Sequence, residues 1–244
     1  MKKLIIITLI LSFILGACSL PQKVTVENTP TSEPTEVPTE VPTEVPTEIP
    51  TETPTEIPTE IQTPTPEPHS SVLVVYFSRT GEQSSVGMID KGNTEIVAEM
   101  IAEKTAADIF QILPEVDNYP YTYKELTEMA KREQDSKARP AYAGEVTDLV
   151  GYETIFIGAP VWWNDWPMIM YTFFEQNAEA LAGKTLIPFS THDGSGLSGF
   201  DIKLATTLPN SNIGTGLAVK GTEAQNATEF IRVTVNNWLS QMGF

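Results

Sequence analysis

The sequence predicts an α/β domain in which five parallel strands form a doubly wound sheet with helices on both faces. Three stretches, 72–77, 154–159 and 185–191, are largely apolar without alternation, which is typical of strands buried on both sides. Segments with the apolar spacing of helices separate these runs. Because crossovers between parallel strands are right-handed, such an alternation places helices on both faces of one sheet.

Capping and turn residues delimit the predicted elements. The first strand, 72–77, ends at Ser78, and Asn93 with Glu95 suits the start of the next helix. A second strand over 108–113 stops at Pro114, and Pro167 lies near the first turn of a later helix. The other predicted elements are a charged helix facing solvent at 121–137, a strand at 154–159, a helix at 167–181, a strand at 185–191, a short helix at 199–208, a strand at 213–219 and a closing amphipathic helix at 224–239.

The first 17 residues have the pattern of a secretory signal. Two lysines precede an apolar run of about a dozen residues, which is too short to span a bilayer comfortably. The run ends in Leu15-Gly16-Ala17-Cys18, which resembles the bacterial lipoprotein signal, in which cleavage precedes a cysteine that receives lipid. We therefore expect lipidation at Cys18 and a location on the outer face of the cell membrane. The alternative is a plain signal peptide or an uncleaved anchor with a chance cysteine.

Residues 18–70 are predicted to form a disordered linker. Seven copies of Pro-Thr-Glu followed by Val, Ile or Thr begin at Pro34 and repeat every four residues. A proline at every fourth position forbids helix, and the repeated glutamates repel one another. Such a segment cannot bury a core. It acts either as a stalk that holds the domain away from the membrane or as a plain tether, and the folded domain is predicted at 71–244.

The charge of the chain excludes two classes of partner. The net charge is −17, of which residues 1–70 contribute −7 and the domain −10. Nucleic acid and anionic membrane surfaces both require basic patches, so neither is an expected partner of the domain, and only the lipid on Cys18 links the chain to a membrane. Because Cys18 is the only cysteine, the domain has no disulfide, no cysteine metal site and no catalytic thiol.

The loop after the first strand is a candidate anion site. Ser78, Arg79 and Thr80 follow the strand directly, and Asn93 with Thr94 opens the next helix. Hydroxyls, amides and the N–H groups at a helix start are suited to a phosphate monoester. The glycine-rich patterns of nucleoside triphosphate and dinucleotide sites are absent. An ordinary loop with a helix cap is the structural alternative.

A cluster of tryptophans follows the strand at 154–159. Trp162, Trp163 and Trp166 fall within five residues, and large aromatic side chains in a loop are costly to expose. A flat aromatic ligand stacked on an indole face explains them. Packing beneath the following helix is the alternative, which we accept for Trp166, whereas Trp162 or Trp163 is expected to stack on the ligand.

The third loop, Thr191 to Gly196, is rich in glycine and follows the strand at 185–191 directly. Its backbone N–H groups are suited to the polar edge of a ring, and His192 or Asp193 can tune a proton or a charge. A lone histidine is, however, more often structural than chemical.

Together, these three loops resemble the flavodoxin-like FMN-binding domains, over essentially all of residues 71–244. Residues 76–81 with 92–94 match the family's phosphate loop, and residues 160–163 and 191–196 match the two loops that bracket the isoalloxazine ring. The resemblance implies strand order 2-1-3-4-5 and noncovalent FMN whose phosphate is held without cations. The residues that it places at the cofactor are Ser78, Arg79, Thr80, Asn93, Thr94, Pro160, Val161, Trp162, Trp163, Thr191, His192, Asp193, Gly194 and Gly196.

One feature departs from the family pattern. Eleven residues, 82–92, separate Gly81 from Asn93, whereas the family's phosphate loop is usually uninterrupted. The inserted segment either folds aside and leaves the phosphate shell intact or covers the edge of the flavin as a lid.

The resemblance and the predicted location favour a lipid-anchored, extracytoplasmic electron carrier with FMN as its cofactor and an unidentified redox protein as its partner. An FMN-dependent NAD(P)H:quinone or flavin reductase is the alternative, and it needs an open site for a second substrate. A surface module that binds a ligand without redox chemistry is a further alternative, because fold alone does not determine function.

Overall fold

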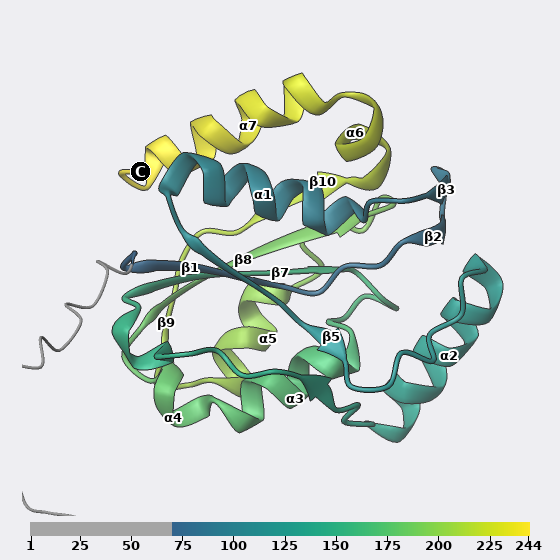
Figure 1. Cartoon of the computed structure of the whole chain (residues 1–244), viewed down its shortest axis with the longest axis horizontal. Helices are drawn as coiled ribbons and strands as arrows, with labels where there is room; N and C mark the ends of the chain where they lie inside the picture. The colour runs from purple at the N-terminus through teal and green to yellow at the C-terminus, as the bar shows by residue number, and fades with distance from the viewer. Residues whose placement is uncertain (1–69) are drawn as a thin grey trace, which may run out of the picture. The chain divides into compact units, whose positions relative to one another are not determined.

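The structure is a computed structural model that describes residues 70–244. The predicted signal at 1–17 and the linker up to residue 69 lie outside the described residues. The described chain forms one parallel sheet between two layers of helices (Figure 1). Within residues 70–244, every helix is too short or too polar to cross a membrane.

The main strands are β1 (Val72–Tyr76), β4 (Asp108–Gln111), β7 (Thr154–Pro160), β8 (Thr185–His192) and β10 (Leu217–Lys220). They pair in parallel in the order β4-β1-β7-β8-β10, which confirms the predicted order 2-1-3-4-5. The run at 213–219 is not one strand, because the short β9 (Asn212–Ile213) and β10 both pair with β8. Gly214 and Gly216 lie between them, and glycine weakens a strand interior.

One face of the sheet is covered by α1 (Asn93–Thr105), α6 (Gly221–Asn226) and α7 (Thr228–Gln241) (Figure 1). The apolar stripe of α1, including Val97 and Ile101, packs with Val74 and Phe156 of the sheet. The helix predicted at 224–239 is two helices, because Ala227 leaves the helical region of backbone conformation.

The other face is covered by α2 (Tyr123–Ser136), α3 (Met168–Gln176), α4 (Ala178–Leu181) and α5 (Phe200–Thr207), with a 3₁₀ turn at Leu149–Gly151. The prediction that α2 faces solvent is correct only for its outer side, because Leu126 and Ala130 are buried. The strand predicted at 108–113 is β4 followed by β5 (Leu113–Pro114), and β5 pairs with β6 (Tyr142–Ala143) in a separate small sheet.

The inserted segment after β1 forms an antiparallel hairpin of β2 (Gly81–Gln83) and β3 (Gly87–Ile89). Figure 1 places this hairpin near the start of α1 and beside α2. Because all main strands are parallel, their carboxyl ends meet at one edge of the sheet, and the three predicted loops and the hairpin gather there.

Candidate functional site

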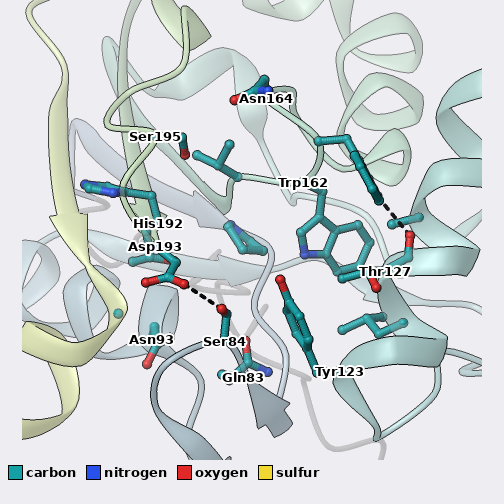
Figure 2. Close-up of a pocket in the computed structure, with 17 residues that line it drawn as sticks. Gln83, Ser84, Asn93, Tyr123, Thr127, Trp162, Asn164, His192, Asp193 and Ser195 are labelled. Carbon is teal, nitrogen blue, oxygen red and sulfur yellow. Dashed lines mark hydrogen bonds between the residues drawn. The ribbon is translucent and has the colours of Figure 1, made fainter.

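A cavity of about 510 Å³ lies at the carboxyl ends of the strands. Its walls come from the β2–β3 hairpin, the start of α1, one side of α2, the loop after β7, the loop after β8 and the start of α6 (Figure 2). This volume lies in the usual range for small-molecule sites, and the position is the one at which doubly wound sheets bind ligands.

The start of α1 presents free backbone donors. The hydroxyl oxygen of Ser78 accepts a hydrogen bond from the N–H of Glu95 at 3.2 Å, whereas within residues 70–244 the N–H groups of Asn93 and Thr94 have no partner. The side chain of Ser78 lies against Gly92, where an added Cβ would come 2.0 Å from the hydroxyl oxygen. Position 92 therefore requires glycine, and the two halves of the loop meet despite the insertion between them.

Two hydrogen bonds fix the polar side chains around this helix start. Gln225 of α6 donates through Nε2 to Oδ1 of Asn93 at 2.9 Å, which leaves the amide nitrogen of Asn93 as a donor. The hydroxyl oxygens of Thr94 and Thr191 are 2.7 Å apart. These bonds connect the start of α1 to α6 and to the end of β8.

The tryptophan loop turns tightly at Trp163 and Asn164. Trp162 and Asp165 exchange two backbone hydrogen bonds at 3.0 and 2.9 Å, and both residues between them have positive φ, as in a two-residue hairpin turn. Trp162 packs edge-on against Phe77, with ring centroids 5.4 Å apart. Trp163 is 50% exposed and donates through Nε1 to the carbonyl oxygen of Thr127 at 2.8 Å.

Both Trp162 and Trp163 line the cavity, whereas Trp166 belongs to the core. Its ring stacks on that of Phe200, with centroids 3.6 Å apart and an interplanar angle of 17°. The core position expected for Trp166 is confirmed. The stacking of Trp162 or Trp163 on a ligand stays a prediction.

The loop after β8 carries His192 and Asp193. Nδ1 of His192 accepts a hydrogen bond from the N–H of Gly194 at 2.9 Å, and burial, with the charge of Lys220 as a second cause, lowers the pKa of His192 below its usual range. The imidazole is therefore neutral at pH 7 and adds no charge to the cavity. The hydroxyls of Ser84 and Ser85 donate to Oδ2 of Asp193 and lower the pKa of its carboxyl.

Arg79 does not line the cavity. Its Nη1 donates to both carboxylate oxygens of Asp117, at 2.8 and 2.7 Å, and its Nη2 donates to the carbonyl oxygen of Tyr119. The guanidinium lies 5.3 Å from the centroid of the Tyr119 ring. This arrangement gives Arg79 a structural role in holding the segment before α2.

The structure brings most of the predicted site residues together. Those that line the cavity are Asn93, Pro160, Val161, Trp162, Trp163, Thr191, His192 and Asp193. Ser78 and Thr94 lie beside the helix start through the bonds described above, whereas Thr80, Gly194 and Gly196, like Arg79, are not part of the lining. A direct contact of any of these residues with a ligand stays a prediction.

Sequence reasoning missed the wall that α2 provides. Tyr123, Leu126, Thr127 and Ala130 line the cavity, and the four-residue spacing of Leu126 and Ala130 was the available signal. The charged residues of the same helix obscured it. Asn164, Ser195 and Gly221 were also absent from the predicted site residues. Gln83 and Ser84 belong to the inserted segment, for which a position over the flavin edge was one of the two alternatives.

Comparisons with known proteins agree with this geometry. A family model described as flavodoxin matches residues 71–241, whereas no curated protein matches the chain. A candidate flavoprotein from Bacteroides uniformis ATCC 8492 is 31% identical with a TM-score of 0.51, over 71% of this chain and 99% of that chain. One from Bacteroides eggerthii DSM 20697 is 26% identical with a TM-score of 0.55, over 71% and 98%. A flavoprotein from Lactobacillus acidophilus NCFM, solved in complex with FMN, shares the fold at 18% identity and a TM-score of 0.50, over 65% and 97%.

Proposed function

Because the chain belongs to the flavodoxin family, we propose that its domain binds FMN in the cavity at the strand ends and carries electrons on it. The observation that carries this proposal is that one cavity contains both the hydrogen-bond donors at the start of α1 and the aromatic side chains of the tryptophan loop. The Lactobacillus acidophilus flavoprotein of the same fold was solved with FMN, which supports the choice of cofactor.

The phosphate end of FMN fits the start of α1. The N–H groups of Asn93 and Thr94 and the amide nitrogen of Asn93 are donors without cationic charge, and the positive end of the helix dipole adds to them. No lysine or arginine lines the cavity in the described part of the chain. A phosphate would therefore be held by neutral groups, as the family resemblance implies.

The ring end fits the space between the tryptophan loop and α2. Trp162 and Tyr123 present aromatic surface to the cavity (Figure 2). Leu126 adds apolar surface from α2. An isoalloxazine ring removes such surface from water when it enters. Thr191, whose hydroxyl meets that of Thr94 at the start of α1, lies on the same wall and offers a polar group to the ribityl chain.

The flavin supplies the redox chemistry when bound, and the protein supplies binding and charge. The domain carries a charge of −10, and His192 contributes no positive charge because its pKa is lowered. An acidic surrounding disfavours added negative charge on the ring. We therefore expect a low reduction potential, which suits a donor of single electrons to another protein.

The test is an absorbance spectrum of the purified full-length chain with added FMN, followed by stepwise anaerobic reduction. Bound flavin that is reduced in two resolved one-electron steps is the expected result. If the bound flavin takes up two electrons in one step, and the protein reduces a quinone with a nicotinamide donor, the function is that of a reductase and not of an electron carrier. No binding at micromolar FMN would overturn the proposal.

The location is part of the same proposal: a lipid on Cys18 holds the domain at the outer face of the cell membrane. It is supported by the apolar run that ends at the only cysteine. A Cys18→Ser variant is expected to move from the membrane fraction to the soluble or secreted fraction and to lose incorporation of labelled fatty acid. An unchanged membrane fraction in Cys18→Ser would contradict lipidation as the anchor.

A further inference from the structure

The β2–β3 hairpin contributes Gln83 and Ser84 to the wall of the cavity and is held at both sides. On one side it contacts the segment that begins α2, and on the other it contacts the loop after β8. Resting on the proposed function, we propose that this hairpin is a strap over the FMN site and that Asp193 is the positioning residue that keeps it closed.

The side of the strap near α2 is a fixed attachment. The N–H of Glu82 donates to the carbonyl oxygen of Tyr121 at 2.8 Å, and the carboxylate of Glu82 accepts from the N–H of Tyr123 at 2.8 Å. Gly81 has φ +92°, and an added Cβ there would come 2.8 Å from the carbonyl oxygen of Tyr121. Backbone groups and a close approach of two chain segments therefore fix this side.

The other side is a latch made only of side chains. The hydroxyls of Ser84 and Ser85 donate to one carboxylate oxygen of Asp193, at 2.5 and 2.9 Å, and these bonds lie in an exposed environment. The nearby charges are Lys220 and Glu223, with His192 neutral. Exposed hydrogen bonds between side chains exchange readily with water. This side can therefore open while the side near α2 stays in place.

The latch lies between the two ends of the proposed site. Figure 2 shows the bond from Ser84 to Asp193 with Asn93 on one side and Trp162 and Tyr123 on the other. Ser84 and Asp193 both line the cavity. A ligand that reaches from Asn93 to Trp162 passes this bond, and in the proposal the strap opens when the ligand enters or leaves.

A strap has a kinetic signature that distinguishes it from a direct contact. Loss of a direct contact speeds dissociation and leaves association nearly unchanged. Loss of a latch lowers a barrier that FMN crosses both when it binds and when it leaves. The association and dissociation rate constants therefore both rise, and the affinity changes little. This signature is measurable with FMN itself, because flavin fluorescence changes on binding.

The experiment measures FMN association and dissociation by stopped-flow fluorescence with the full-length chain. In Asp193→Ala, and in the double variant Ser84→Ala/Ser85→Ala, both rate constants are expected to rise about tenfold, with the dissociation constant changed less than about threefold. Combining the three substitutions should raise the two rate constants little further, because all three remove the same latch. Met88→Ala is the matched control, since Met88 lies on the same hairpin, is 69% exposed and has no part in the latch.

Two results would overturn the strap. A faster dissociation without faster association in Asp193→Ala would make Asp193 a direct FMN contact. Unchanged rates in both latch variants would show that the hairpin does not obstruct the site.

A readout without cofactor separates this proposal from the proposed function. If the unmodified chain binds no FMN, the proposed function fails, and the strap is tested by hydrogen exchange of residues 81–89. Faster exchange there in Asp193→Ala than in the unmodified chain would support the latch, whereas identical exchange would overturn it.

Discussion

The hydroxyl oxygens of Thr94 and Thr191 lie 2.7 Å apart, and both residues are almost fully buried. Thr94 belongs to the first turn of α1, the helix that follows β1 and the hairpin, and Thr191 belongs to the end of β8. In the sheet, β7 lies between β1 and β8. This bond therefore ties the proposed phosphate end of the site to the loop that carries the latch.

Thr94→Val is expected to lower the free energy of unfolding by about 1–3 kcal/mol, because it leaves the hydroxyl of Thr191 buried without a partner. The double variant Thr94→Val/Thr191→Val should recover part of this loss, since it removes both polar groups. Urea unfolding of the three chains measures the difference. A double variant less stable than Thr94→Val alone would contradict this account.

Trp166→Ala is expected to lower the free energy of unfolding by about 3–5 kcal/mol, because Trp166 is 1% exposed and stacks on Phe200. Trp163→Ala is the control from the same loop, and its half-exposed ring predicts a much smaller loss. Thermal or urea unfolding measures both. Equal losses would mean that the two tryptophans have similar surroundings.

Trp162→Leu is expected to weaken FMN binding about tenfold, because leucine keeps the apolar bulk but removes the aromatic face. Trp163→Leu should weaken it less, since the indole of Trp163 is directed to the carbonyl oxygen of Thr127 on α2. Fluorescence titration with FMN measures both affinities. A larger loss in Trp163→Leu would assign the stacking surface to Trp163 instead.

Glu133 predicts a pH-dependent contribution to stability. Its carboxylate accepts a hydrogen bond from the hydroxyl of Tyr119 at 3.1 Å, and burial raises the pKa of Glu133 above its usual range despite that bond. Above the ordinary value of 4.5, the folded protein holds a proton that the unfolded chain has lost, so stability falls as the pH rises through the window between the two pKa values.

Glu133→Gln removes that loss. Relative to the unmodified chain, the variant is expected to gain stability as the pH rises above 4.5, the ordinary pKa of a glutamate, because glutamine cannot ionise. Urea unfolding at several pH values checks the trend, with Glu128→Gln as the control on the exposed side of the same helix. A stability difference that does not change with pH would show that Glu133 has an ordinary pKa.

Arg79→Lys is expected to lower the free energy of unfolding by about 1–3 kcal/mol, because lysine cannot reproduce the bonds to both oxygens of Asp117 and to Tyr119. FMN affinity should change less than about threefold, since the Arg79 side chain is only 8% exposed and does not line the cavity. Unfolding and FMN titration of the same variant test both parts. A large loss of FMN affinity without a loss in the free energy of unfolding would show that Arg79 contacts the cofactor, as the sequence predicted.

The strands and their loops were predictable because unbroken apolar runs and the polar segments after them are local patterns. The order of the strands came from the resemblance of three loops to one family, not from periodicity. Arg79 shows the limit of prediction from local patterns. Its position beside Ser78 suggested a ligand contact, whereas its partner Asp117 is 38 residues away in the sequence. The contact between Ser84 and Asp193 is harder still to predict, since the two residues are 109 positions apart and no sequence pattern links them.

The hairpin leaves and rejoins the main fold at almost one point, because Ser78 and Gly92 lie against each other. Within the segment between them, Arg79, Gly81 and Glu82 contact the residues before α2, whereas the arm from residue 83 to residue 91 extends from a junction that the chain leaves and re-enters at one place. Because the two ends of the arm meet there, a shorter or longer arm can be exchanged without moving the start of α1. The same scaffold can thus be adapted to fast or slow cofactor turnover by replacing one contiguous segment.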